Sequence, residues 1–198
     1  MTGRERLIAA LNRRPIDRLP WSLCMDGYYT SSLPEQGHSM DLLTTLRYFR
    51  NDIMERHVPI FRLVQPGVEV REERRGGGLR TVWTTPVGEI CEDRLQTGRT
   101  WYIAKPPLAT LDDVKVYRWI VEHGRYEPDF KTFLARDAVI GDDGLATPSG
   151  PVTPVQQLLQ HLMRIENTVY LMNDEPGEMD ELLCAIHRRD LGAYRILA

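Results

Sequence analysis

The sequence predicts an α/β protein, and three observations lead to this expectation. Apolar residues recur at helical spacing in several segments, most clearly at 175–198. Short apolar runs typical of buried strands alternate with these segments, as at 18–25 and 145–153. The stretch 68–104 instead alternates polar and apolar residues around glycine turns. We therefore expect a parallel α/β sheet or barrel in which 68–104 is an inserted antiparallel sheet.

The first part of the chain alternates helical and extended patterns. Leu7, Ile8 and Leu11 share one face of the first predicted helix, and Thr2 is suited to cap its N-terminus. The predicted elements are, in order, a helix at 4–12, a buried strand at 18–25, a helix at 41–48 and an extended region at 53–63 that Pro59 interrupts.

The second part begins with the antiparallel insertion, in which we expect three or four strands. Gly76–Gly78 is interpreted as a hairpin turn rather than a phosphate-binding loop. Thr110 is a candidate N-cap for the helix that follows the insertion. The later predicted elements are helices at 111–123 and 129–138, a short strand at 145–153, short helices at 155–163 and 167–172, and the long helix at 175–198.

The last helix carries an apolar stripe that needs a partner surface. Its members are Met179, Leu182, Leu183, Ile186, Tyr194 and Leu197. Because the chain stops directly after this helix, we expect the 198 residues to form a single partial domain, the front part of a larger α/β enzyme.

Composition excludes several classes of function. The formal net charge is -3, with 25 basic and 28 acidic residues, whereas binding to nucleic acid requires a basic excess. The sequence contains neither a signal peptide nor a run of apolar residues long enough for a membrane span, so no membrane partner is expected. Cys24, Cys91 and Cys184 are far apart and odd in number, which favours a reducing cytoplasm over a disulfide framework.

The first candidate site follows the strand predicted at 18–25. Asp26, Tyr28 and Tyr29 come directly after it, and the C-terminal ends of barrel strands carry the active site in that fold. Asp26 is therefore a candidate catalytic base or a substrate ligand, with the tyrosines as substrate contacts. The alternative is a turn aspartate that caps the next segment.

Asp52 is the second candidate, because it stands at the start of a predicted strand. A desolvated carboxylate there would exchange protons near neutral pH, whereas the alternative is a plain turn residue. His57 and Arg62 are candidate contacts for an anionic substrate, unless they are simply solvated. The third candidate is 147–153, where Gly150 would let the backbone approach a ligand and Thr153 is suited to cap the following helix.

These residues, in this order, resemble the uroporphyrinogen decarboxylase superfamily. The segments that carry the resemblance run over nearly the whole chain. They are Arg4-Glu-Arg-Leu-Ile-Ala-Ala-Leu-Asn with Pro15-x-Asp17-Arg18-x-Pro20-Trp21, Asn51-Asp52-Ile53, Thr85-Pro86-Val87-Gly88-Glu89, Tyr117-Arg-Trp-Ile-Val-Glu-His and Ser149-Gly-Pro-Val-Thr153. The resemblance implies the first half of a (β/α)8 TIM-type barrel with the antiparallel insertion around 68–104.

The chain departs from the decarboxylases of this superfamily at the loop after the first strand. Their Met-Arg-Gln-Ala-Gly-Arg-Tyr type loop, whose arginines hold the substrate carboxylates, is replaced here by Met25-Asp26-Gly27-Tyr28-Tyr29. Gln157 stands where the resemblance would place a substrate-binding tyrosine. A substrate with eight carboxylates needs cationic partners. The resemblance therefore favours the sister branch, which transfers a methyl group between a corrinoid and a thiol.

The resemblance also implies cofactors and partners. A methyltransferase of this branch would use zinc and a corrinoid, the latter carried by a corrinoid protein, with zinc ligands in the second half of the barrel. Two alternatives remain open. The first is uroporphyrinogen decarboxylation in porphyrin biosynthesis, without a cofactor and with Asp52 stabilising a protonated pyrrole. The second is a catalytically silent binding fragment whose open sheet edge pairs with another copy or another chain.

The residues themselves predict no metal site. The histidines are not paired with each other or with cysteines at ligand spacing, and Cys184 with His187 on the last helix is interpreted as packing.

Overall fold

Backbone contacts divide the chain into two units, each with its own hydrophobic core. The computed structural model describes residues 1–25, 41–98 and 100–198. Unit 1 comprises Met1–Ile60 and Asp129–Ser149, and unit 2 comprises Phe61–Pro128 and Gly150–Ala198. This division into two units does not test whether residues 1–198 form a single partial domain, which stays a prediction.

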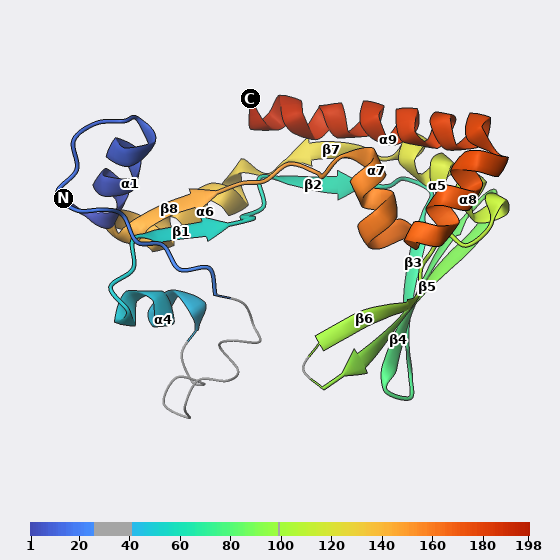
Figure 1. Ribbon diagram of the computed structural model, residues 1–198, viewed down its shortest axis with the longest axis horizontal. Helices are drawn as coiled ribbons and strands as arrows, with labels where there is room; N and C mark the ends of the chain where they lie inside the picture. The colour runs from blue at the N-terminus through green and yellow to red at the C-terminus, as the bar shows by residue number, and fades with distance from the viewer. Residues whose placement is uncertain (26–40, 99) are drawn as a thin grey trace. The chain divides into compact units, whose positions relative to one another are not determined.

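Unit 1 is built around two parallel strands, β1 (Ile53–Arg56) and β8 (Gly144–Thr147), which Figure 1 shows side by side. Its helices among the described residues are α1 (Gly3–Leu11), α4 (Leu42–Tyr48) and α6 (Phe130–Ile140), and the short 3-10 turn η1 (Gly141–Asp143) leads into β8. The core joins both strands to α4 and α6. Its buried members are Leu43, Leu46, Ile53, Val58, Ile140 and Ala146.

Local signals explain where these helices begin. Thr2 and Glu5 form a reciprocal capping box at the start of α1, as the sequence predicts for Thr2. The side chains of Asp41 and Asp129 accept hydrogen bonds from the first turns of α4 and α6 in the same way.

The strand predicted at 18–25 is wrong. These residues form no strand, and the N–H groups of Trp21 and Leu23 are bonded to side chains. One backbone bond, from Asp52 N to the carbonyl oxygen of Trp21 at 2.9 Å, joins the segment to the residue before β1. Trp21 N donates to Asp52 Oδ2 and Leu23 N donates to Asn51 Oδ1, at 2.9 and 3.0 Å. Pro20 has no N–H to donate. The predicted burial is also wrong, since none of these residues is fully buried, and Leu19 and Trp21 are 82 and 49 % exposed.

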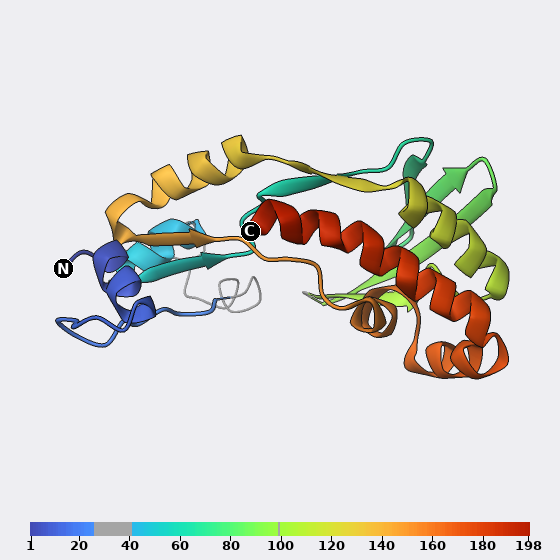
Figure 2. The same cartoon turned by 90° about the horizontal axis from the view of Figure 1, so that it is seen from above.

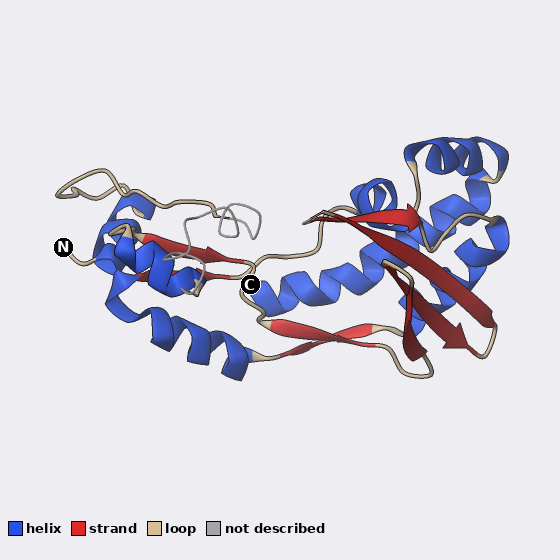
Figure 3. Cartoon of the chain, turned by 90° about the horizontal axis from the view of Figure 1, so that it is seen from below, coloured by secondary structure: helices blue, strands red, loops and turns tan. Residues whose placement is uncertain are grey.

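Unit 2 contains the antiparallel insertion. Its four strands are β3 (Glu69–Arg75), β4 (Gly78–Thr85), β5 (Gly88–Thr97) and β6 (Thr100–Lys105), paired in that order. Figure 3 shows the twist of this sheet. The predicted insertion at 68–104 is confirmed as an antiparallel sheet. A shorter antiparallel pair joins β2 (Phe61–Val64) to β7 (Arg125–Pro128).

The helices of unit 2 supply most of its core. They are α5 (Leu111–His123), α7 (Pro154–Gln157), the π-helical turn η2 (Leu158–Leu162), α8 (Ile165–Asp174) and α9 (Pro176–Leu197). Figure 2 shows α9 beside α5 and along β7. On the predicted stripe of α9, Met179, Leu182 and Ile186 are almost fully buried in this core.

The far end of α9 has a different partner. Tyr194 remains about half exposed, and its hydroxyl donates to the carbonyl oxygen of Pro151 at 2.6 Å. The stripe predicted from the sequence is therefore covered at its N-terminal half and only partly covered at its C-terminal half.

The overall prediction is supported at the level of fold class. The chain is a mixed α/β protein, and its described residues include the parallel pair of β1 and β8. The sequence did not reveal strand β7 because it is short, charged and ends in Pro128. The part of the chain that the structure describes contains no closed barrel. The half-barrel therefore remains a proposal. No helix among the described residues is long and apolar enough to cross a membrane.

Replacement of Gly144 tests how closely the parallel strands β1 and β8 approach each other. A Cβ at this position would overlap the carbonyl oxygen of Ile53 on the paired strand. Gly144→Ala should therefore lower the free energy of unfolding by about 1–3 kcal/mol or more, measured by urea denaturation. Gly192→Ala is the matched control, because a Cβ there meets nothing within 4 Å in the middle of α9. That variant should gain about 0.5–1 kcal/mol, and equal losses in both would contradict the packing described.

Candidate functional site

The C-terminal edge of the parallel pair brings polar side chains together in unit 1. Strand β1 ends at Arg56 and is followed by His57, while β8 ends at Thr147 and is followed by Pro148 and Ser149. His57 Nδ1 and Ser149 Oγ lie 2.8 Å apart, within hydrogen-bond distance. In parallel sheets, ligands bind at the carboxyl ends of the strands. The pair therefore occupies the edge at which a site is expected.

The backbone holds His57 in an uncommon conformation. Its φ is 61°, in the left-handed region. Arg13 and Arg50 also have positive φ, but they follow the C-terminal caps of helices α1 and α4, where this conformation is ordinary. His57 instead follows a strand, and Val58 N returns to the carbonyl oxygen of Thr147 at 3.2 Å. Strain of this kind concentrates at functional positions.

A cavity of about 220 Å³ lies beside this edge. Its apolar lining comes from the 18–25 segment, from α4 and from Met54 of β1, and its polar lining comes mainly from the end of β1. The described residues around it are Leu23, Cys24, Met25, Leu42, Leu46, Met54, Glu55, Arg56 and His57. The mixture of an apolar wall and one histidine suits a small organic molecule.

The charges at the edge are largely compensated. Glu55 accepts from Arg136 Nε with both carboxylate oxygens at 2.8 Å, so this carboxylate is oriented by α6. Thr147 Oγ1 donates to the carbonyl oxygen of Glu55 and fixes the ends of the two strands together. Arg56 is exposed and is the one arginine among the described residues that line the cavity.

Asp52 lies at the opposite end of β1 from His57. Its side chain is 2 % exposed and is paired with Arg6 of α1, also buried, and with the half-exposed Arg18. Arg18 donates to both oxygens at 2.8 and 2.9 Å, and Trp21 N donates at 2.9 Å. Every oxygen of this carboxylate is thus engaged by donors of unit 1. We call Asp52 with Arg6, Arg18 and Trp21 N the anchor of unit 1, because it joins separate segments of that unit. Asp52 is not among the described residues that line the cavity beside His57.

Asp17 completes this anchor from the solvent side. It accepts from Arg6 Nε and Nη2 at 2.6 and 2.9 Å and from the amino terminus of Met1 at 3.2 Å. The hydrogen bond from Arg6 holds the pKa of Asp17 well below its usual range. The Asp17-Arg18 pair that the resemblance singled out is thereby explained by ion pairing around Asp52.

Asp26, Tyr28 and Tyr29 lie outside the described residues. The structure therefore gives them no position, and their predicted roles stay predictions. Arg62 is placed on β2 of unit 2, where its exposed side chain pairs with Glu127 across the β2–β7 ladder at 2.7 Å.

The three candidates from 150–157 all belong to unit 2, and each has a structural partner. A Cβ on Gly150 would meet the Tyr194 ring at 2.7 Å, so close packing against α9 accounts for glycine there. Thr153 caps α7, as predicted, by accepting from Gln156 N. Gln157 Nε2 donates to Asp190 Oδ2 at 2.5 Å, and its Oε1 accepts from Arg189 Nη2 at 3.2 Å.

Gln157 therefore belongs to a polar network beneath α9. Arg189 and Asp190 form an ion pair whose side chains are 5 and 4 % exposed, and the Tyr126 hydroxyl donates to Asp190 Oδ1 at 3.3 Å. A buried ion pair needs such additional hydrogen bonds to offset its loss of hydration. The network gives Gln157 a role in the fold.

Sequence reasoning named His57 but missed Ser149 as its partner. The predicted strand at 145–153 hid this signal, because β8 ends at Thr147 and Ser149 follows that end. Among the described residues, no three histidine, cysteine, aspartate or glutamate side chains are grouped to hold a metal ion.

Comparisons with known proteins provide no relative for the site. No family model, curated protein or solved structure matches the chain.

Replacement of Asp52 should destabilise the protein strongly. Asp52→Asn removes the charge that two arginines share, one of them buried, and should lower the free energy of unfolding by about 3–5 kcal/mol in urea denaturation. Asp143→Asn is the control, since Asp143 pairs with Arg47 at 2.7 Å while both side chains are more than 40 % exposed. That change should cost at most about 1 kcal/mol, and similar costs would mean that the Asp52 pairs contribute little.

Tyr126 should make stability depend on alkaline pH. Burial raises the pKa of Tyr126 to about 12 from an ordinary value of 10, with the nearby Arg189 opposing the shift. In the unfolded chain the phenol would ionise near pH 10, so the folded state binds more protons between pH 10 and 12. The free energy of unfolding should therefore fall across that window. Tyr126→Phe should flatten this part of the profile in denaturation at fixed pH steps, and an unchanged slope would contradict the assignment.

Proposed function

We propose that this chain is part of an enzyme of the uroporphyrinogen decarboxylase superfamily, of the kind that transfers a methyl group between a corrinoid and a thiol. The proposal rests on the resemblance of the sequence and on one observation: a small, largely apolar cavity at the C-terminal edge of β1 and β8, with His57 in its wall. The site's polar groups suit the thiol half of such a reaction.

Size and charge favour a small thiol over a porphyrinogen. The described residues enclose about 220 Å³, below the roughly 300–1,000 Å³ of pockets for drug-sized ligands. A tetrapyrrole with eight carboxylates would also need several cations, whereas the described lining offers Arg56 alone. In addition, Asp52, which would stabilise a protonated pyrrole in a decarboxylase, is enclosed by Arg6 and Arg18. Decarboxylation is therefore the less favoured alternative.

His57 supplies the proton chemistry in this proposal. In the tautomer that this proposal requires, Nδ1 carries the hydrogen and donates to Ser149 Oγ. Nε2, which has no partner among the described residues, then accepts a proton. The thiolate is the nucleophilic form of a thiol. His57 would take the S–H proton as the sulfur forms its bond to the methyl carbon. The carbon–cobalt bond of the methyl donor would break in the same step and leave its electron pair on the cobalt, while Ser149 orients the ring.

The cofactors of this family fit the described residues poorly. No described cluster provides three zinc ligands, so no step of this proposal runs through zinc. The cavity is also too small to enclose a corrinoid, and the proposal therefore assigns the methylated corrinoid to a partner protein as a substrate that approaches from outside. What the chain contributes is the binding and deprotonation of the thiol.

The test is a methyl-transfer assay with methylcobalamin as donor and 2-mercaptoethanol as acceptor. The thioether product is measured by mass spectrometry. His57→Ala should lower the rate by about 10²-fold or more, as expected for loss of a general base, while Ser149→Ala should have a smaller effect. His187→Ala is the matched control, because His187 is an exposed histidine on α9 of unit 2.

Two outcomes would contradict the proposal. One is the absence of thioether with the wild-type protein, and the other is a His57→Ala variant that is as active as His187→Ala. Loss of carboxyl groups from uroporphyrinogen in a parallel incubation would instead support the decarboxylase.

A further inference from the structure

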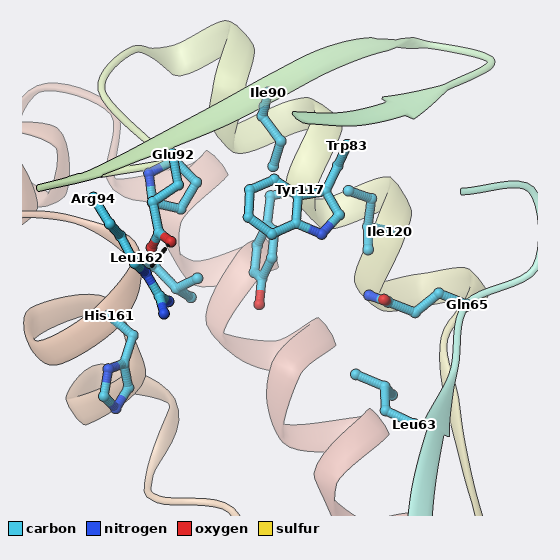
Figure 4. A pocket seen from close by; sticks show the side chains of 11 residues that line it. Leu63, Gln65, Trp83, Ile90, Glu92, Arg94, Tyr117, Ile120, His161 and Leu162 are labelled. Carbon is cyan, nitrogen blue, oxygen red and sulfur yellow. Dashed lines mark hydrogen bonds and ion pairs between the residues drawn. The ribbon is translucent and has the colours of Figure 1, made fainter. Parts of the chain in front are cut away.

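A second cavity lies entirely within unit 2 and is independent of the proposed methyl transfer. Its volume is about 270 Å³, and it lies between the inserted sheet, α5 and the π-helical turn η2. The wall is mostly apolar and includes Trp83, Ile90, Ile120 and Leu162 (Figure 4). Ile90 and Ile120 are almost fully buried in the core of this unit, so that part of the wall is fixed by packing.

Polar groups converge on one side of this cavity. Figure 4 shows Arg94 and His161 together on one side and Leu63 and Gln65 on the other, with the Tyr117 hydroxyl directed between them. The cavity thus has a cationic or hydrogen-bond-donating side at Arg94 and His161 and a mostly apolar wall, with the carboxamide of Gln65 on the opposite side. This asymmetry is typical of sites that orient an amphipathic small molecule.

Arg94 is held in place but keeps donors available. Its Nε donates to Glu92 Oε1 at 2.5 Å, and Glu92, two residues earlier on the same face of β5, is 4 % exposed. Among the described residues, neither Nη1 nor Nη2 of Arg94 has a partner. Two parallel N–H groups of a guanidinium match the two oxygens of a carboxylate. The ion pair with Glu92 thus orients the Arg94 side chain, which is 51 % exposed, and leaves its fork open to an anion.

The charge balance limits the ligand to a single negative charge. Glu92 already neutralises Arg94, and a dianion such as phosphate would be repelled by this buried carboxylate at close range. His161 is exposed and adds a further donor without a partner among the described residues. Donors therefore exceed acceptors on this side of the cavity, which excludes a cationic ligand as the preferred occupant.

We propose that this cavity binds a small monocarboxylate with an aromatic or branched apolar body. The carboxylate would lie at Arg94 and His161, and the apolar body would contact Trp83, Ile120 and Leu162. Since the volume is below that of pockets for drug-sized ligands, the expected ligand has about ten to fourteen non-hydrogen atoms.

The probe is 3-phenylpropanoate, compared with the uncharged 3-phenylpropan-1-ol and the cationic 3-phenylpropylamine. Binding to the wild-type chain is followed by calorimetry and by the indole N–H signals in NMR spectra. The carboxylate should bind at least tenfold more tightly than the alcohol or the amine. The Trp83 signal, assigned with Trp83→Phe, should shift, whereas that of Trp21 in unit 1 should not.

Two variants test the polar side of the site. Arg94→Gln should weaken binding of 3-phenylpropanoate at least tenfold, and His161→Ala, which alters an exposed side chain, keeps the test valid if Arg94→Gln unfolds. Arg71→Gln is the control, because it changes an exposed arginine of the same sheet outside the cavity. No binding of 3-phenylpropanoate at millimolar concentration, equal binding of the three probes, or equal affinities in all variants would overturn the proposal.

Discussion

The buried carboxylate of Asp52 is the constraint on which unit 1 depends. It joins three segments that have no backbone ladder among them: helix α1 through Arg6, the extended 18–25 segment through Arg18 and Trp21, and the start of β1. A charge in this position would be unfavourable without its partners, because desolvation costs several kcal/mol for each ion. The position of the start of β1 follows from this set of contacts.

Unit 2 depends on a different force. The buried stripe of α9 packs against α5, and the core extends to Ile90 of the inserted sheet. The polar network of Gln157, Arg189, Asp190 and Tyr126 lies next to this apolar core and is saturated with hydrogen bonds. Burial supplies the free energy, and the network restricts how α7, α9 and β7 pack. The cavity with Arg94 and Glu92 lies on the sheet side of the same core, so its wall has little freedom to collapse.

Local patterns predicted much of the secondary structure, and long-range partners explain the failures. The caps at Thr2, Thr110 and Thr153, the inserted sheet and the stripe of α9 were predictable because each depends on residues close together in the sequence. The segment 18–25 was misassigned because Asn51 and Asp52 bind its N–H groups. Of the candidate site, His57 was named from the sequence as a contact for an anionic substrate, and that role stays a prediction. Its partner Ser149 stands 92 positions away, and only the parallel pairing of β1 and β8 places the two residues together.

The two ends of β1 have separate sets of contacts, which affects how the protein tolerates substitutions. Asp52 and His57 are separated by a strand that spans roughly 13–17 Å, and they share no partner. Energetic effects at such a distance usually add without coupling. Substitutions near His57, at the C-terminal end of β1, could therefore introduce new chemistry during evolution, while the contacts at the opposite end of the strand continue to maintain the fold.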